Sequence, residues 1–112
     1  PFHCPLMAPA ADVMADALAD ISITPLPVAL VANITAQPVT DPAEIRHLLV
    51  EQVTGMVRWR ECVLTMKEQG VDTMVEIGAG KVLSGLGRRI DADLDGMSVG
   101  TPETIEEFLN GL

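Results

Sequence analysis

The segment Val71–Ile90, VDTMVEIGAGKVLSGLGRRI, decides the fold class, because it changes from a strand pattern to a helix pattern across a glycine turn. Residues 71–77 alternate toward a strand, and residues 81–90 are expected to form a helix. Arg88 and Arg89 suit the end of that helix, where the helix dipole is negative. A strand that leads directly into a helix is typical of layered α/β proteins.

Gly78-Ala79-Gly80-Lys81 forms the turn, where backbone N–H groups gather and an anion would be stabilised. A P-loop has the form GxxxxGK followed by Ser or Thr, whereas here only Ala79 separates the glycines and Val82 follows the lysine. The Rossmann pattern requires a third glycine where Leu83 stands. Neither nucleotide motif is present, and the pattern favours a tight turn with positive φ.

The rest of the chain reads as helices that alternate with short apolar strands. Periodicity and helix-start signals predict helices over 6–21, 42–53, 59–69 and 101–109, and strands over 28–32 and 97–99. Together with the segment above, this order predicts an α/β fold with a mostly parallel sheet layered with helices. No boundary is visible that would divide residues 1–112 into separate domains.

Several residues mark where these elements begin and end. Asp41 is expected to cap the helix that follows it, and Gly70 to end the next helix. Val28–Ala32 is a continuous apolar run, the form expected of a strand buried on both faces. Gln37–Pro42 reads as a linker. Asn33, at the end of the apolar run, either faces a cleft or starts a turn.

Composition excludes several classes of partner. The chain has 112 residues, enough for one small domain with a core, and 48% of them are hydrophobic. Its formal net charge of −9 argues against binding to nucleic acid and to anionic membranes, since both attract basic proteins. No apolar run approaches the length of a membrane span and no secretory signal is visible, which predicts a cytoplasmic protein.

The metal-ligating side chains are few. Cys4 and Cys62 are the only cysteines, and His3 and His47 the only histidines. Their spacing matches no zinc pattern, so no metal site is predicted. Two reduced thiols are expected in preference to a disulfide, because the composition is that of a cytosolic protein.

His3 is the candidate catalytic residue of the stretch PFHCPLM, in which a proline lies close on either side of it. Imidazole has an ordinary pKa near neutrality and is therefore suited to proton transfer, although a lone histidine beside an apolar run also suits a structural role. GMSVG at 96–100 has the letters of GxSxG, but Ser98 falls in a predicted strand and not at a strand-to-helix turn, so no serine stands in a nucleophile elbow. A nucleophile for His3 would therefore have to come from sequence upstream of Pro1.

Four separated segments carry a family resemblance: FHCPLM at 2–7, PVALVAN at 27–33 with Thr35, VEQV at 50–53 leading to VRW at 57–59, and EIGAGKVL at 76–83. In this order they resemble the C-terminal part of malonyl-CoA:acyl-carrier-protein transacylases, the acyltransferases of bacterial fatty-acid synthesis. The similarity runs through essentially the whole chain.

In that family a serine in a GHSxG motif takes malonyl from coenzyme A and passes it to the phosphopantetheine thiol of acyl-carrier protein, with no further cofactor. The resemblance implies that His3 deprotonates this serine and that Gln52 orients His3, a pair that uses no carboxylate. It also implies an α/β-hydrolase-like acyltransferase domain, with residues 1–112 as the C-terminal segment of its large subdomain. The implied partners are malonyl-CoA, the carrier protein and the upstream segment of the same enzyme.

The serine motif, the arginine that grips the malonyl carboxylate and much of the oxyanion hole belong to family segments that this sequence lacks. Residues 1–112 alone are therefore expected to be inactive. Two alternatives stay open: an acyltransferase domain of a polyketide synthase, or a non-catalytic module that docks an acidic carrier protein through Arg58, Arg60, Arg88 and Arg89.

Overall fold

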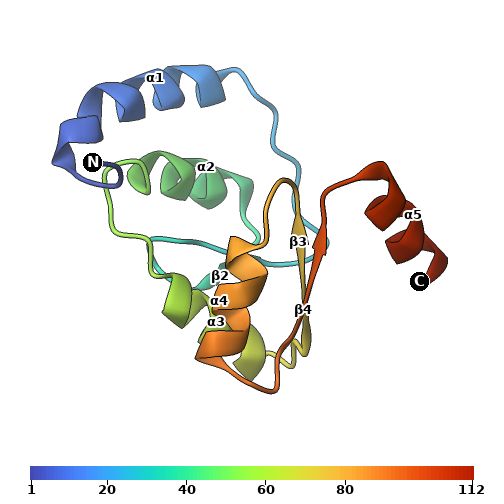
Figure 1. Ribbon diagram of the computed structural model, residues 1–112. Coiled ribbons are helices and arrows are strands. Elements are labelled where there is room, and N and C mark those ends of the chain that lie inside the picture. The colour runs from blue at the N-terminus through green and yellow to red at the C-terminus, as the bar shows by residue number, and fades with distance from the viewer. The chain divides into compact units, whose positions relative to one another are not determined.

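The computed structural model describes residues 1–112 throughout, and they form two compact units, Pro1–Thr65 and Met66–Leu112. The first unit contains η1 (Pro5–Met7), α1 (Ala8–Ala19), β1 (Leu30–Val31), β2 (Pro38–Val39), α2 (Pro42–Glu51) and most of α3 (Trp59–Glu68). The second unit contains the end of α3, then β3 (Thr73–Ile77), α4 (Val82–Ile90), β4 (Asp95–Val99) and α5 (Pro102–Asn110) (Figure 1).

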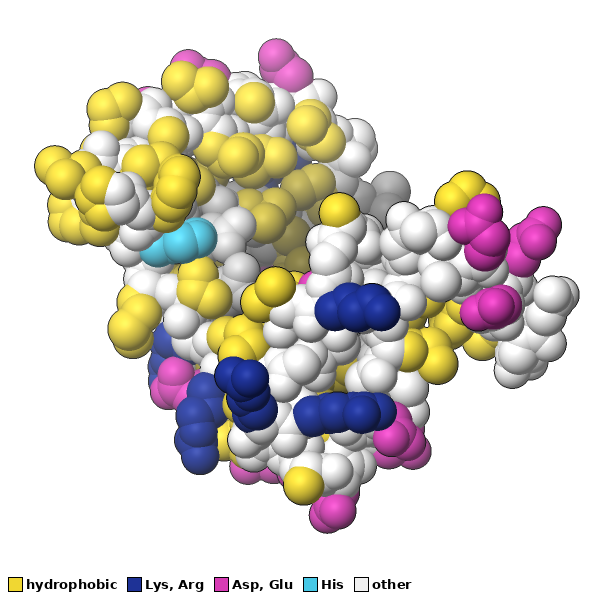
Figure 2. All heavy atoms as spheres, in the orientation of Figure 1, with side chains coloured by type: hydrophobic (Ala, Val, Ile, Leu, Met, Phe, Trp, Pro, Cys, Tyr) yellow, Lys and Arg dark blue, Asp and Glu magenta, His cyan; other side chains and the backbone are white.

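The N-terminal helix forms where apolar periodicity predicted it, but its apolar side is not buried. Prolines stand at the starts of η1 and α1, where a missing N–H leaves no helical bond unmade. α1 runs beside α2, yet none of its residues is buried (Figure 1). Hydrophobic side chains gather over α1 in Figure 2. We name the apolar α1 face by its exposed members: Leu6, Val13, Met14 and Ile21.

The apolar run 28–32 forms a shorter and more exposed strand than predicted. Only Leu30–Val31 pairs, antiparallel, with Pro38–Val39, and Val28 is 73% exposed. β2 ends at Val39 and α2 begins at Pro42, so no strand residues stand opposite Val28 and Ala29. The prediction of a strand buried on both faces is therefore wrong, and the segment predicted to be a linker contains β2.

α2 begins and packs as the sequence predicted. The Asp41 side chain accepts a hydrogen bond from the N–H of Glu44 at 2.8 Å, which caps the helix at its first turn. Ile45 and Leu48, one helical turn apart, face inward from α2. They form the core of the first unit together with Ala32 and Val39.

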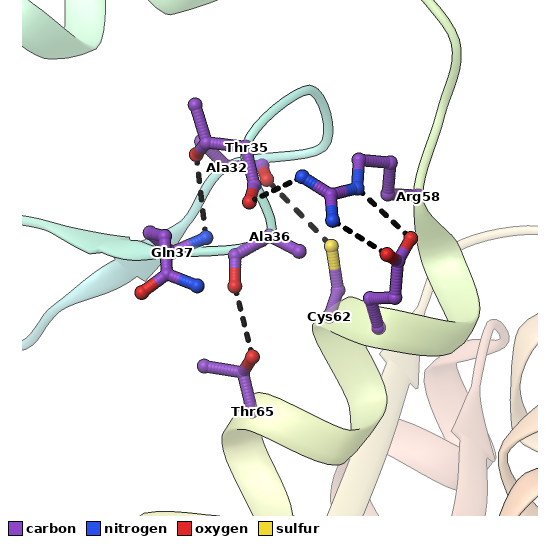
Figure 3. Close-up of polar contacts among 8 residues, drawn as sticks. Ala32, Thr35, Ala36, Gln37, Arg58, Cys62 and Thr65 are labelled. Carbon is purple, nitrogen blue, oxygen red and sulfur yellow. Dashed lines mark hydrogen bonds and ion pairs between the residues drawn. The ribbon is translucent and has the colours of Figure 1, made fainter.

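α3 is attached by side-chain hydrogen bonds to the turn that joins β1 to β2. Three side chains, one just before α3 and two within it, donate to backbone carbonyls of this turn, which lie within residues 32–36 (Figure 3). The bonds run from Arg58 Nη1 to Thr35 O at 3.0 Å, from Cys62 Sγ to Ala32 O at 3.6 Å and from Thr65 Oγ1 to Ala36 O at 2.8 Å. These three hydrogen bonds attach both ends of the turn to α3 and to the residue just before it.

The second unit is a parallel strand pair joined by a helix. β3 pairs with β4 in register from Thr73 opposite Asp95 to Ile77 opposite Val99, and α4 packs against both strands. Gly78 and Gly80, which join β3 to α4, have φ of +134° and +103°. The tight turn with positive φ is thus confirmed, as is the α/β fold class. No helix has the length and apolar character needed to cross a membrane.

Candidate catalytic site

His3 lies in the first unit with its imidazole exposed, and its ring contacts the end of α2. The backbone of His3 has a φ of +54°, a left-handed conformation that is uncommon for a residue with a side chain. Its Nδ1 atom lies 2.7 Å from the backbone carbonyl oxygen of Gln52. A carbonyl oxygen can only accept a hydrogen bond, so this contact selects the tautomer that carries its proton on Nδ1. The other ring nitrogen, Nε2, then has a lone pair available for a proton.

Gln52 offers its carbonyl because it stands at the C-terminal cap of α2. Its own N–H donates to Leu48 O at 3.1 Å, and the helix ends one residue before it. The last carbonyls of a helix have no partner within the helix. The carbonyl of Gln52 is thus free to accept from His3. The structure brings together the two residues that the sequence singled out, through the main chain of Gln52 and not through its side-chain amide.

The side-chain amide of Gln52 has a different partner. Its Oε1 atom accepts a hydrogen bond of 2.8 Å from Nδ2 of Asn33, and both side chains are half-buried. Asn33 comes two residues after the end of β1, and its side chain reaches the end of α2. Both roles left open for Asn33 fit, because it begins the turn at 33–35 and also lines a cavity.

That cavity has a volume of about 110 Å³ and lies between β1 and α2. Its wall is made by aliphatic side chains and by two amides, Asn33 and Gln52. The cavity therefore bears on how the two amides are held.

Arg58, one of the four arginines considered for docking, is engaged inside the first unit. Its guanidinium binds the carboxylate of Glu61 with both Nε, at 2.9 Å, and Nη2, while Nη1 donates to Thr35 O. The side-chain hydrogen bond is the main cause that raises the pKa of Arg58 and lowers the pKa of Glu61. Arg88 and Arg89 are exposed in the last turn of α4, where Figure 2 shows basic side chains.

The first turn of α4, which follows the glycine turn, is hydrogen-bonded to Glu76 of β3. The Glu76 carboxylate accepts hydrogen bonds from the N–H of Ser84 at 2.8 Å, from the Ser84 hydroxyl at 2.9 Å and from the N–H of Leu83 at 3.2 Å. These bonds, led by that from the Ser84 N–H, lower the pKa of Glu76. Glu76 therefore caps the N-terminus of α4 from the preceding strand.

Both cysteines are free thiols, with Cys4 half-buried and Cys62 buried. Burial raises the pKa of the Cys62 thiol. No group of three or more His, Cys, Asp or Glu side chains is placed to hold a metal ion.

The contact of Asn33 with Gln52 was not predicted from the sequence. Periodicity marks Asn33 only as a polar residue after an apolar run, and Gln52 only as a polar residue at a helix end. The sequence shows only that Asn33 follows a predicted strand and that Gln52 stands at the end of a predicted helix. This limits the polar residues that can meet in an α/β unit but does not identify the pair that does.

Several known proteins are similar to this chain over nearly its whole length. No family model matches the chain. Malonyl CoA-acyl carrier protein transacylase of Bacillus subtilis is 40% identical over 95% of this chain, and that of Haemophilus influenzae is 41% identical over 97%. This chain covers 33% and 36% of those two proteins, so it spans about a third of their length.

Solved structures agree. An acyl-carrier-protein-S-malonyltransferase from Bartonella henselae matches 99% of this chain with a TM-score of 0.90 and 50% identity, and the match covers 35% of that chain. A malonyl-CoA:acyl carrier protein transacylase from Xanthomonas oryzae matches 99% of this chain with a TM-score of 0.87 and 39% identity, again over 35% of its own length. The resemblance to malonyl-CoA:acyl-carrier-protein transacylases is thereby confirmed, for a chain that corresponds to about a third of such a protein.

Proposed function

We propose that this chain is the C-terminal portion of a cytoplasmic acyltransferase that transfers malonyl from coenzyme A to the phosphopantetheine thiol of acyl-carrier protein in fatty-acid synthesis. The observation that carries the proposal is the hydrogen bond from His3 Nδ1 to the carbonyl of Gln52. It leaves Nε2 of an exposed imidazole ready to accept a proton. The similarity to named transacylases supports the choice of acyl group and of carrier.

The chemistry assigned to His3 is proton transfer in both halves of a ping-pong reaction. Nε2 takes the proton of a serine hydroxyl as the serine oxygen attacks the malonyl thioester, and returns it to the departing coenzyme A thiolate. In the second half Nε2 takes the proton of the carrier thiol as its sulfur attacks the acyl-serine ester, and returns it to the serine oxygen. The route needs no cofactor, and malonyl-CoA and the carrier protein are its substrates.

The carbonyl of Gln52 serves this chemistry in two ways. It fixes the ring orientation and the tautomer, as a carboxylate does in a Ser-His-Asp triad. When Nε2 gains its proton the ring becomes a cation, and the carbonyl dipole at the C-terminus of α2 stabilises that charge. Gln52 is therefore a positioning residue, and His3 is the catalytic residue.

The serine is assigned to the part of the relatives that this chain does not cover. The apolar α1 face supports this assignment. Leu6 is 76% exposed and Val13 is 68% exposed, and an uncovered apolar surface of this kind is typical of a site for another protein segment. We expect the remaining two thirds of such a protein to cover it and to complete the active site, and residues 1–112 alone to show no transfer.

The test is malonyl transfer by a chain of the relatives' full length, or by residues 1–112 combined with the upstream segment in trans. His3→Ala is expected to lower the transfer rate by several orders of magnitude. His47→Ala is the matched control, because His47 is an exposed histidine of α2 that contacts only the neighbouring Glu51. Near-normal transfer by His3→Ala would refute the proposed role of His3.

A polyketide carrier is the alternative within the same chemistry. One solved relative, 38% identical over the whole of this chain, is a malonyl-transacylase in complex with a type II polyketide-synthase acyl-carrier protein. Transfer rates to fatty-acid and polyketide carriers, measured side by side with the same enzyme, distinguish the two readings. The carrier with the higher kcat/KM identifies the pathway class.

A non-catalytic docking module is the alternative from a different class. Arg58 is hydrogen-bonded to Glu61 and Thr35. The exposed arginines that could contact a carrier protein are therefore Arg60, Arg88 and Arg89. Titration of residues 1–112 with an acidic carrier protein at low and moderate salt tests this idea, because contacts between exposed charges weaken as salt rises. Salt-sensitive binding together with no transfer in the full-length protein would favour the docking module.

A further inference from the structure

We propose that Asn33 is a positioning residue for His3, which it reaches through Gln52. In this arrangement the Asn33 amide holds the side chain of Gln52, so that the carbonyl of Gln52 keeps facing Nδ1 of His3. The hydrogen bonds that join Asn33, Gln52 and His3 all lie within the first unit. That they serve catalysis rests on the function proposed above.

The two hydrogen bonds of Gln52 make it the middle member of a chain of three residues. Asn33 Nδ2 donates to Gln52 Oε1 at 2.8 Å, and Gln52 O accepts from His3 Nδ1 at 2.7 Å. The first bond uses the side chain of Gln52 and the second its main chain. A change at Asn33 can therefore reach His3 without any direct contact between Asn33 and His3.

The position of Gln52 explains why its side chain must be held. Gln52 is the C-cap of α2, and helix ends open more readily than helix interiors. Its N–H is bonded to Leu48 O and Val50 O, and the N–H of Val53, in the same peptide group as the Gln52 carbonyl, is bonded to Val50 O at 3.1 Å. The bond to Asn33 adds an attachment beyond the Cα atom, inside a largely aliphatic cavity wall. This added attachment restricts the direction of the carbonyl further at a helix end, where backbone bonds open readily.

Asn33 is itself held firmly enough to act as an anchor. Its backbone carbonyl accepts from the N–H of Arg58 at 2.8 Å, just before α3 begins. The side chain of the same Arg58 donates to Thr35 O two residues further along the turn. The turn after β1 is thus tied to α3 on both sides of Ile34, and the Asn33 side chain extends from a fixed backbone.

The bond from Asn33 to the Gln52 side chain predicts that substitutions of Gln52 differ in their effect on His3, which the backbone contact between His3 and Gln52 alone does not predict. Any residue at position 52 supplies a backbone carbonyl, but only a side chain with an acceptor at the reach of glutamine keeps the bond to Asn33. Gln52→Leu therefore keeps the carbonyl and loses the attachment. Gln52→Glu keeps both, because a carboxylate oxygen accepts from Asn33 Nδ2.

The test is the tautomer of His3, read from the two ring nitrogens by long-range ¹H–¹⁵N NMR on residues 1–112. Spectra are recorded at alkaline pH, where imidazole side chains are neutral. We expect His3 to hold its proton on Nδ1 in the wild type and in Gln52→Glu. In Asn33→Ala and Gln52→Leu we expect a mixture of the two tautomers, with free histidine in the same buffer as the reference for an unconstrained ring.

Every outcome of this NMR experiment bears on the role of Asn33. Dispersed amide resonances establish that a variant is folded, and if Asn33→Ala does not fold, the tautomer of His3 is measured in Gln52→Leu instead. A folded variant that has lost the Asn33–Gln52 bond but keeps the wild-type tautomer of His3 overturns the proposal. So does a loss of the Nδ1 proton in Gln52→Glu equal to that in Gln52→Leu.

Transfer kinetics of the full-length protein provide the second readout. Asn33→Ala is expected to lower kcat about tenfold to a hundredfold, the usual effect of losing an outer partner that orients a reacting group, and to leave KM unchanged. The NMR experiment requires no turnover, so the two proposals can fail separately. Absent transfer with the expected tautomer shift refutes only the function, and His3-dependent transfer with no tautomer shift refutes only the role of Asn33.

Discussion

The α-carbon of Gly100 lies so close to the carbonyl oxygen of Gly78 that a methyl group on Gly100 would overlap that oxygen. The two segments are drawn together by the hydrogen bond from Gly78 N–H to Val99 O, at 3.0 Å. We expect Gly100→Ala to lower the free energy of unfolding by about 1–3 kcal/mol, because the backbone at the end of the parallel strand pair must move. Urea denaturation measures the change.

Gly85 provides the matched control in the same unit. It lies within α4, and nothing is found within 4 Å of where a methyl group would stand. Alanine in a helix interior is favoured over glycine by roughly 0.5–1 kcal/mol, so Gly85→Ala should raise the stability. Equal effects of the two substitutions would contradict the close approach at Gly100.

Glu76→Gln is expected to destabilise the protein in a manner that depends on pH. The folded state lowers the pKa of Glu76 below its usual 4.5, chiefly through the bond from the Ser84 N–H. A lowered carboxyl pKa contributes stability above the unfolded pKa, and this contribution disappears as pH falls through the folded pKa. The urea midpoint of Glu76→Gln should therefore lie below that of the wild type near neutral pH.

The two midpoints should converge as the pH falls from about 4.5 toward the lowered pKa. Glu106→Gln serves as the control, because Glu106 is exposed on α5. A difference between Glu76→Gln and the wild type that stays constant down to about pH 3 would contradict the charge-dependent cap.

Arg58→Lys is expected to lower the urea midpoint although it conserves the charge. A lysine ammonium cannot bind the Glu61 carboxylate with two nitrogens and also reach Thr35 O, as the guanidinium does. Arg60→Lys, at an exposed position two residues away, should leave the midpoint unchanged. Equal midpoints for both variants would show that charge alone matters at position 58.

The two thiols should differ in reactivity. Cys62 is buried, burial raises its pKa, and its Sγ faces Ala32 O, so little thiolate is present and access is blocked. Cys4 is half-buried. Iodoacetamide followed by peptide mass spectrometry should find Cys4 alkylated in the native protein and Cys62 alkylated only after urea is added. Rapid native labelling of Cys62 would contradict the burial.

Local signals in the sequence were enough to predict where most elements begin and end. Asp41 caps α2, Gly70 follows the end of α3 with a φ of +87°, and the two glycines of the turn before α4 have positive φ. These signals work because a cap or a left-handed turn depends on one side chain and its nearest neighbours.

Strand pairing could not be predicted in the same way. The run from Val28 was expected to be buried throughout, whereas its pairing begins only at Leu30, because the partner strand β2 ends at Val39 and α2 follows. β4 begins two residues earlier than the predicted strand, at Asp95, because its partner β3 sets the register. A pattern within one segment holds no information about the length of the segment that pairs with it.

The contacts of the candidate site residues could not be predicted from the sequence. His3 was singled out by its imidazole as well as by the family resemblance, and Gln52 by the resemblance alone. That the bond between them uses a backbone carbonyl is invisible in a sequence, because every residue has one. Asn33 was predicted to face a cleft or to start a turn. Its bond to Gln52 joins residues that are far apart in the sequence, so it depends on how β1 and α2 pack.

The carboxylate of Glu76 also explains why a turn so similar to phosphate loops need not attract phosphate. The N–H groups at the start of α4 already hold a negative charge that is tethered to the adjoining strand. A dissolved ion would have to displace this internal counter-ion, whose effective concentration reaches the millimolar range or above for a short tether. The carboxylate of Glu76 thus takes the place that a phosphate group holds at the start of the helix in nucleotide-binding proteins.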